Sequence, residues 1–211
     1  MQKIIGKDKF KKNFYERISD FFYFRLIELS PLKMILSSSF FKIKGNKKKF
    51  PTVLQLPITY KCNSKCKMCD IWKMKSSDEY SIEDFELLLR DPIFKEITSV
   101  GINGGEPSLL KNLPEYAKVI VKLPKISSLN IISNGFNQKL LLFYVEKIYQ
   151  MCKIKKIKFH ISISLDGYGE IHNIVRGKEN AFEKTIATID EIILNQEKYC
   201  DSLDLGCTII Q

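Results

Sequence analysis

The alternation of strand-like and helix-like runs from residue 52 onward constrains the fold of this chain more than any other feature. Strand, helix, strand repeated in this way builds parallel strands joined by right-handed crossovers, so we predict an α/β fold. The strand-like runs are 53–59, 97–103, 128–133, 157–165 and 203–210. The helix-like runs between them are 81–90, 114–123, 138–151 and 181–195.

The end of the sequence bears on the completeness of this sheet. The chain stops at Gln211, within or just after the fifth strand-like run. No helix follows that could cover this strand, and an uncovered strand edge favours association with other chains. We therefore predict a partial or split protein whose parallel sheet is truncated after the fifth strand.

The net charge of +10 is concentrated in one segment. Residues 1–50 hold 13 Lys and Arg against 4 Asp and Glu, whereas residues 51–211 hold 21 against 20. We predict a basic aromatic arm over 1–50 and a nearly neutral core domain over 51–211, which argues against a nucleic-acid partner. The arm suits either a helix packed on the core or a segment that contacts a membrane surface or a partner.

Cysteine usage and the lack of long apolar runs indicate the compartment. No run approaches the roughly 18–20 apolar residues of a membrane helix, and the N-terminal residues show no signal-peptide pattern. Three of the six cysteines are clustered like metal ligands instead of being spread as a disulfide framework. We predict a reducing compartment, the cytoplasm.

The clustered cysteines are Cys62, Cys66 and Cys69, in the spacing C-x3-C-x2-C directly after the first strand-like run. Three thiolates from one loop can hold three irons of a [4Fe–4S] cube, and the fourth iron then has no protein ligand nearby. A structural zinc ion is the alternative, although it normally takes four ligands in spaced pairs. We expect the other three cysteines to be buried small side chains and not ligands: Cys152, Cys200 and Cys207.

Polar motifs also end the second and third strand-like runs. The second ends in Asn103-Gly104-Gly105-Glu106-Pro107, where two glycines let backbone approach a ligand and Glu106 can accept from an ammonium group. The third ends in Ser133-Asn134-Gly135, which alone is an ordinary turn. Neither motif is specific by itself.

The fourth strand-like run has one polar face. Because side chains alternate along a strand, four polar residues share a face that must look into a cavity or at water: His160, Ser162, Ser164 and Asp166. A central parallel strand is normally covered on both sides, so this polar face predicts either a bound ligand or a filled barrel interior. Ten residues beyond Asp166, Arg176 offers a guanidinium suited to a carboxylate.

Together these motifs resemble the radical S-adenosylmethionine (SAM) superfamily, over about residues 52–211. Their order at successive strand ends makes the combination specific where each part is weak. The form of these motifs resembles that of the branch of peptide- and protein-modifying maturases with an auxiliary-cluster extension. The resemblance rests on Cys62, Cys66 and Cys69, then 104–107, 133–135, 164–167, His172 through Arg176-Gly177, and Ala181-Phe182.

The resemblance implies a partial (β/α)6 barrel in which the unligated iron chelates the amino and carboxylate groups of SAM. By analogy, the methionine amino group is held by Gly104, Gly105 and Glu106. The sixth strand and an auxiliary-cluster extension are absent from this sequence.

The resemblance also implies the rest of the SAM pocket. Ser164 and Arg176 address the carboxylate or the ribose, and Asp166 lies near the ribose hydroxyls. Asn134 lines the same pocket. Met68 stands where many relatives place an aromatic residue beside adenine, so its role is less defined by the resemblance.

The implied activity is that of a radical SAM enzyme. One electron from a small redox protein or a chemical reductant enters the cluster, and SAM is cleaved to methionine and a 5′-deoxyadenosyl radical. The radical abstracts hydrogen from a substrate that the sequence does not name: a peptide, a protein or a small molecule. No residue is identified as an acid or base toward that substrate. Two alternatives stay open: a non-catalytic half-protein that binds cluster and SAM, and a structural zinc-binding interaction protein.

Overall fold

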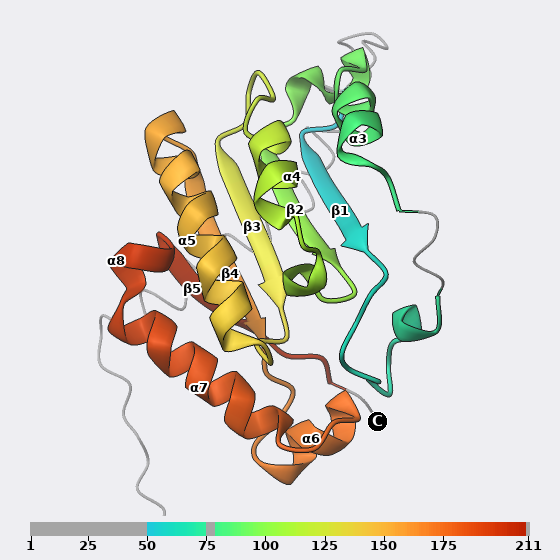
Figure 1. Ribbon diagram of the computed structural model, residues 1–211, viewed down its shortest axis with the longest axis vertical. Coiled ribbons are helices and arrows are strands. Elements are labelled where there is room, and N and C mark those ends of the chain that lie inside the picture. Colours follow the sequence, from blue (N-terminus) through green and yellow to red (C-terminus); the bar gives the residue numbers. More distant parts are fainter. Residues whose placement is uncertain (1–49, 75–78, 210–211) are drawn as a thin grey trace, which may run out of the picture. The chain divides into compact units, whose positions relative to one another are not determined.

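One parallel sheet organises the chain in the computed structural model, which describes residues 50–74 and 79–209. Neighbouring strands are parallel and follow the order of the sequence (Figure 1). The predicted α/β fold is confirmed, and an open sheet of this kind is consistent with a partial (β/α) barrel. The strands are β1 (Val53–Thr59), β2 (Ser99–Gly104), β3 (Ser128–Ser133), β4 (Lys158–Ser164) and β5 (Ser202–Gly206).

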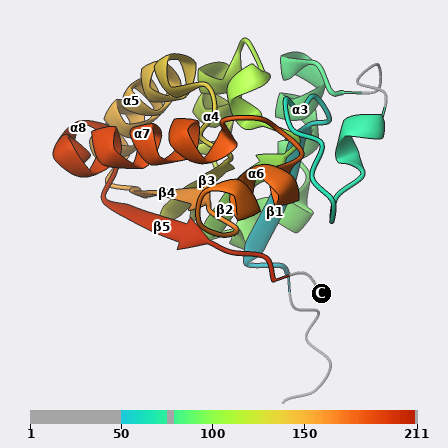
Figure 2. The ribbon, with the colours of Figure 1, turned by 90° about the horizontal axis from the view of Figure 1, so that it is seen from below.

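Helices connect these strands, and Figure 2 shows α4, α5 and α7 over one face of the sheet. The helical runs predicted from the sequence are present, although α5 extends past its predicted end at 151. Two helices, α6 and α8, were not predicted. The described helices are α3 (Ile82–Leu89), α4 (Leu113–Ile120), α5 (Gln138–Lys155), α6 (Glu170–Arg176), α7 (Ala181–Leu194) and α8 (Gln196–Tyr199).

Local sequence explains where two of these helices begin. The Ser81 side chain accepts a hydrogen bond from the Asp84 backbone N–H, with an N···O distance of 3.1 Å, and so caps α3. Pro114 lies in the first turn of α4, where its missing N–H costs nothing. Short 3-10 turns complete the connections: η1 (Ile71–Lys73), η3 (Pro92–Glu96) and η4 (Pro107–Leu109).

The two faces of the sheet differ in chemistry. On the helix-covered face, apolar side chains of β2, β3 and β4 are fully buried: Val100, Ile102, Leu129, Ile131, Phe159, Ile161 and Ile163. On the opposite face polar side chains pair across strands. Ser162 donates to Asn130 over 3.3 Å, and Asn103 donates to Gln55 over 3.1 Å. The alternation predicted for the fourth strand is therefore present along β4, and the polar face corresponds to the interior of a partial barrel.

The fifth strand is shorter than predicted. After Gly206 the chain leaves the sheet, and the Thr208 backbone N–H donates to the Asp166 carboxylate over 2.8 Å. The predicted strand is therefore wrong over residues 207–209, where Thr208 contacts the loop at Asp166 and no strand pairing continues. This contact brings the end of β5 to the same edge of the sheet as the polar motifs.

The arm predicted over residues 1–50 lies, apart from Phe50, outside the described residues, so the proposed roles for it stay predictions. Among the helices of residues 50–74 and 79–209, none is long and apolar enough to cross a membrane.

Candidate functional site

All five strands end at one edge of the sheet, and the predicted motifs follow the first four. In parallel α/β folds ligands bind at this carboxyl edge. A cavity of about 190 Å³ opens there. Its walls contain most of the predicted site residues: Cys62, Cys66, Met68, Cys69, Gly104, Gly105, Asn134, Ser164 and Arg176.

The loop after β1 carries the three clustered cysteines, which are unpaired and half-buried. Among the described residues, no three His, Cys, Asp or Glu side chains meet closely enough to hold one metal ion. Burial raises the pKa of the Cys62 thiol, so binding of a metal cluster must displace a proton there.

The two glycines that end β2 hold this loop by close backbone contact. A Cβ on Gly105 would lie 2.1 Å from the Lys61 carbonyl oxygen, and one on Gly104 would lie 2.5 Å from that of Thr59. The Gly105 N–H donates to Thr59 over 2.7 Å, and the Glu106 N–H donates to Lys61 over 2.7 Å. The sequence predicted glycines for the approach of a ligand. The structure shows that they are also needed for the approach of the chain's own backbone.

The predicted contact of Glu106 with an ammonium group stays a prediction. Glu106 is not among the residues that line the cavity, and it is only 1% exposed. One carboxylate oxygen accepts from the Ser133 hydroxyl over 2.8 Å and from the Ser108 N–H over 3.1 Å. The other accepts from the Asn134 N–H over 2.8 Å. Glu106 thus ties the end of β2 to the end of β3.

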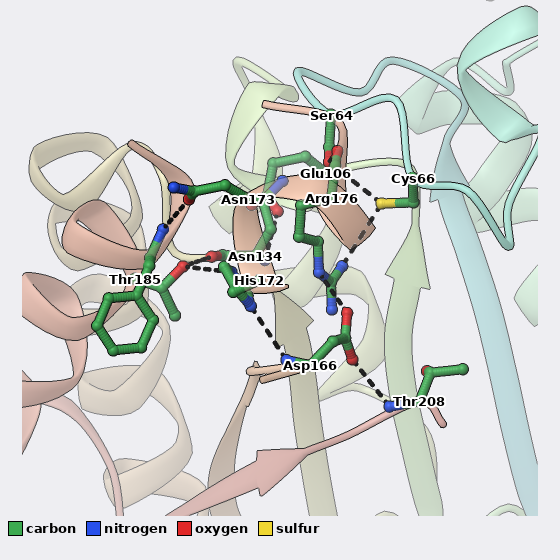
Figure 3. A network of polar contacts seen from close by, with 11 residues as sticks. Ser64, Cys66, Glu106, Asn134, Asp166, His172, Asn173, Arg176, Thr185 and Thr208 are labelled. Atoms are coloured by element: carbon green, nitrogen blue, oxygen red, sulfur yellow. Dashed lines mark hydrogen bonds and ion pairs between the residues drawn. The ribbon is translucent and has the colours of Figure 1, made fainter. Parts of the chain in front are cut away.

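Asp166 and Arg176 form an ion pair beside the cysteine loop (Figure 3). The Arg176 Nε lies 2.6 Å from the Asp166 carboxylate, and the two side chains are 11% and 0% exposed. Asp166 also accepts from the Thr208 N–H and does not line the cavity. The predicted place of Asp166 near ribose hydroxyls stays a prediction. Arg176 does line the cavity, and its Nη1 lies 3.7 Å from the Cys66 Sγ.

The C-terminal end of α6 binds the cysteine loop through its backbone. The Arg176 carbonyl accepts from the Lys65 N–H over 3.1 Å and from the Ser64 hydroxyl over 2.6 Å. A Cβ on Gly177, whose φ is +59°, would lie 2.3 Å from the Lys65 carbonyl oxygen. Helix α6 was missed from the sequence, although Gly177 is the kind of residue that ends a helix in the left-handed conformation.

His172 connects three of these elements (Figure 3). Its Nδ1 accepts from the Asp166 N–H over 3.0 Å, so its Nε2 carries the proton and donates to the Thr185 hydroxyl over 3.3 Å. Thr185 in turn donates to the Asn134 carbonyl over 3.0 Å. Burial lowers the pKa of His172, which keeps the ring neutral as this pattern requires.

The cavity also contains residues that the sequence did not single out. Trp72 lies three residues after Cys69, and its indole Nε1 is buried without a hydrogen-bond partner among residues 50–74 and 79–209. An orphaned buried donor in the wall of a cavity is what a ligand with acceptor atoms would satisfy. The remaining lining residues are Ser64, Ile71, Asn103, Ile132, Ser133 and Thr208.

The other cysteines lie away from this cavity. Cys152 and Cys200 are buried as predicted, and burial raises their pKa values to about 12 and about 11. Cys207 is exposed, so the prediction that it is buried was wrong. It follows Gly206, where the chain has left the sheet and its covering helices.

The family model for the radical SAM superfamily matches residues 56–200 of this chain. The chain belongs to the radical SAM superfamily. The resemblance seen in the motifs is confirmed, and the predicted cofactors, a [4Fe–4S] cluster and SAM, are those of this superfamily. The free thiols in the cavity wall and the unsatisfied indole of Trp72 fit such cofactors.

Relatives of this chain are radical SAM proteins, and the chain matches only part of the length of each. The sporulation killing factor maturation protein SkfB of Bacillus subtilis (strain 168) is 25% identical over 143 residues, which are 67% of this chain and 33% of SkfB. The probable GTP 3′,8-cyclase of Archaeoglobus fulgidus is 31% identical over 146 residues, which are 63% of this chain and 45% of the cyclase. The chain thus spans less than half the length of these relatives.

A solved structure has the same fold. Native anSMEcpe with bound AdoMet and Cp18Cys peptide superimposes with a TM-score of 0.53 and 24% identity. The match covers 74% of this chain and 42% of that one. At this identity the likeness supports the fold alone.

Proposed function

We propose that this chain is the core of a radical SAM enzyme whose cluster is held by Cys62, Cys66 and Cys69. The observation that supports this most is that the cysteine loop shares one cavity with the strand ends of β2, β3 and β4. SAM would bind beside the cluster, against a wall that contains Gly104, Gly105, Asn134, Ser164 and Arg176.

The chemistry that a bound cluster supplies is one-electron reductive cleavage of SAM to methionine and a 5′-deoxyadenosyl radical, which then abstracts hydrogen from a substrate. The chain itself orients SAM beside the loop and excludes water from it. The apolar side chains in the cavity wall help to exclude water: Met68, Ile71, Trp72 and Ile132. Within the described residues we assign no acid or base toward the substrate.

We further propose that a small redox protein supplies the electron and that the protein works in the cytoplasm. The substrate is a peptide, a protein or a small molecule. SkfB is named a maturation protein, whereas the cyclase is named for GTP. The two relatives therefore do not indicate one substrate class.

Metal analysis after anaerobic reconstitution tests the proposal. We expect about four irons and about four sulfides per chain, as for a [4Fe–4S] cube. Alanine at Cys62, Cys66 or Cys69 should abolish the visible absorbance of the cluster. Matched alanine substitutions outside the cavity should leave it intact: Cys152, Cys200 and Cys207. One zinc per chain, or a cluster retained in Cys66→Ala, would overturn the assignment.

A further inference from the structure

The three cysteine sulfurs of the loop do not have equal surroundings. Among residues 50–74 and 79–209, Cys66 is the clustered cysteine whose sulfur lies within hydrogen-bonding distance of a charged side chain, at 3.7 Å from the Arg176 Nη1. The Ser64 hydroxyl lies 3.1 Å from the same sulfur. One corner of the proposed cluster would therefore meet a fixed positive charge (Figure 3).

The guanidinium is held in this position by its partner. Asp166 binds the Arg176 Nε, and its second oxygen is occupied by the Thr208 N–H. The contact between Asp166 and the Arg176 Nε is an ion pair without the alignment of a hydrogen bond among the described residues. Because the guanidinium is planar, holding Nε near the carboxylate limits the positions open to Nη1. Both side chains are almost fully buried, so the position is not that of a mobile surface arginine.

The loop itself is attached by a different part of Arg176. The backbone carbonyl of Arg176 accepts from Lys65 and Ser64, and the Val175 carbonyl accepts from the Lys67 N–H over 3.0 Å. These bonds do not involve the guanidinium. A substitution of the Arg176 side chain can therefore change the surroundings of the Cys66 sulfur while the backbone attachment of the loop persists.

We propose that Arg176, positioned by Asp166, raises the reduction potential of the cluster through the Cys66 sulfur; this inference rests on the proposed function. One electron from a reductant such as dithionite makes the cluster more negative by one charge, and no bond breaks. Hydrogen bonds to the sulfurs and net charge set the potential of such clusters, and a nearby positive charge in a partly dry site favours the reduced form.

The test is a redox titration of the reconstituted full chain without SAM, followed by electron paramagnetic resonance. Leaving SAM out separates this effect from any contact between Arg176 and the SAM carboxylate. In Arg176→Gln we expect the ratio of reduced to oxidised cluster at a given solution potential to fall about tenfold, a shift of about 59 mV to more negative values for one electron.

A matched control is Lys67→Gln. Lys67 is an exposed residue of the same loop, next to Cys66, and its removal changes the net charge by the same amount. Solvent screens an exposed charge, so we expect a much smaller shift in this variant. An equal shift in both variants would show that net charge alone acts, and would overturn the inference.

The single variant leaves Asp166 buried without its partner, so a second variant guards against misfolding. In Asp166→Asn/Arg176→Gln both charges are removed together. We expect a smaller negative shift, because the donor to the sulfur is still lost while removal of the nearby carboxylate charge offsets part of the effect. An unchanged potential in either variant that carries a full cluster overturns the inference. A wild-type chain that binds no cluster overturns the proposed function instead.

Discussion

Two of the attachments of the cysteine loop, to the end of β2 and to α6, use different chemistry. On the side of β2 the contact is backbone against backbone, with room for hydrogen atoms only at Gly104 and Gly105. On the side of α6 the contact combines carbonyl acceptors with a buried ion pair and a guanidinium near the Cys66 sulfur.

The difference between the two attachments separates the position of the cysteine loop from the reduction potential of the proposed cluster. The β2 side has no adjustable side chain, so a substitution there moves the loop or is not tolerated. The α6 side has a charged group whose removal leaves the backbone contacts in place. We therefore expect changes near β2 to affect whether a cluster assembles, and changes of Arg176 to affect its potential.

The largest effect is expected for Gly105→Ala. The new Cβ would lie 2.1 Å from the Lys61 carbonyl oxygen, a backbone atom that cannot rotate away. We expect a cost of about 1–3 kcal/mol in the free energy of unfolding, as for overpacking, and a several-fold loss of bound iron after reconstitution. Gly206→Ala is the control, because a Cβ added at Gly206 would meet no heavy atom within 4 Å. Full iron content in Gly105→Ala would contradict the rigid attachment.

A second effect, similar in size on stability, is expected for Glu106→Gln. The buried carboxylate accepts from Ser133, Ser108 and Asn134, and an amide would turn one N–H group toward a donor. We expect the free energy of unfolding in urea to fall by about 1.5–3 kcal/mol.

The exposed pair of Glu115 with Lys118 provides the control, since Glu115→Gln should cost less than about 1 kcal/mol. Titration with SAM tests the sequence-based role of Glu106 separately. If Glu106→Gln binds SAM more weakly but unfolds like wild type, the contact with the ammonium group is right and the tie between β2 and β3 carries little energy.

The smallest effect is a pH dependence from His172. Burial and Arg176 lower its pKa, while Asp166 and Glu183 oppose that shift. Below the unfolded pKa of about 6.5 the unfolded chain takes up a proton that the folded chain resists, so stability falls on acidification and is complete above that pH. One proton contributes at most about 1.4 kcal/mol per pH unit.

Urea unfolding at pH 7.5 and pH 5.5 measures this effect. We expect His172→Gln to lose less stability between the two pH values than wild type does. A pH dependence in His172→Gln equal to or greater than that of wild type would show that His172 is not held neutral by its surroundings.

The sequence was sufficient for the sheet because its signals are local. Alternating polarity in β4 and the capping Ser81 act within a few residues, so strands and most helices could be predicted. Helix α6 has seven residues and no long apolar pattern, and its position depends on contacts with a loop more than a hundred residues away. Such a contact leaves no periodic signal in the sequence.

The site could be located from the sequence, but the orientation of its side chains could not. Motif order brought the cysteines, Asn134, Ser164 and Arg176 to one cavity. The directions of Glu106 and Asp166 depend on which donors lie nearby after folding: Ser133 and Asn134 for the first, Arg176 and Thr208 for the second. These partners come from other strands and are not marked by spacing.

The central claim is that the cysteine loop holds a [4Fe–4S] cluster with an iron open to SAM. The direct measurement is the electron paramagnetic resonance spectrum of the reduced, reconstituted chain before and after addition of SAM, with 5′-deoxyadenosine assayed in the same sample. We predict a reduced-cluster signal that changes on adding SAM, followed by formation of 5′-deoxyadenosine. A cluster signal that SAM leaves unchanged, with no 5′-deoxyadenosine formed, would contradict the claim.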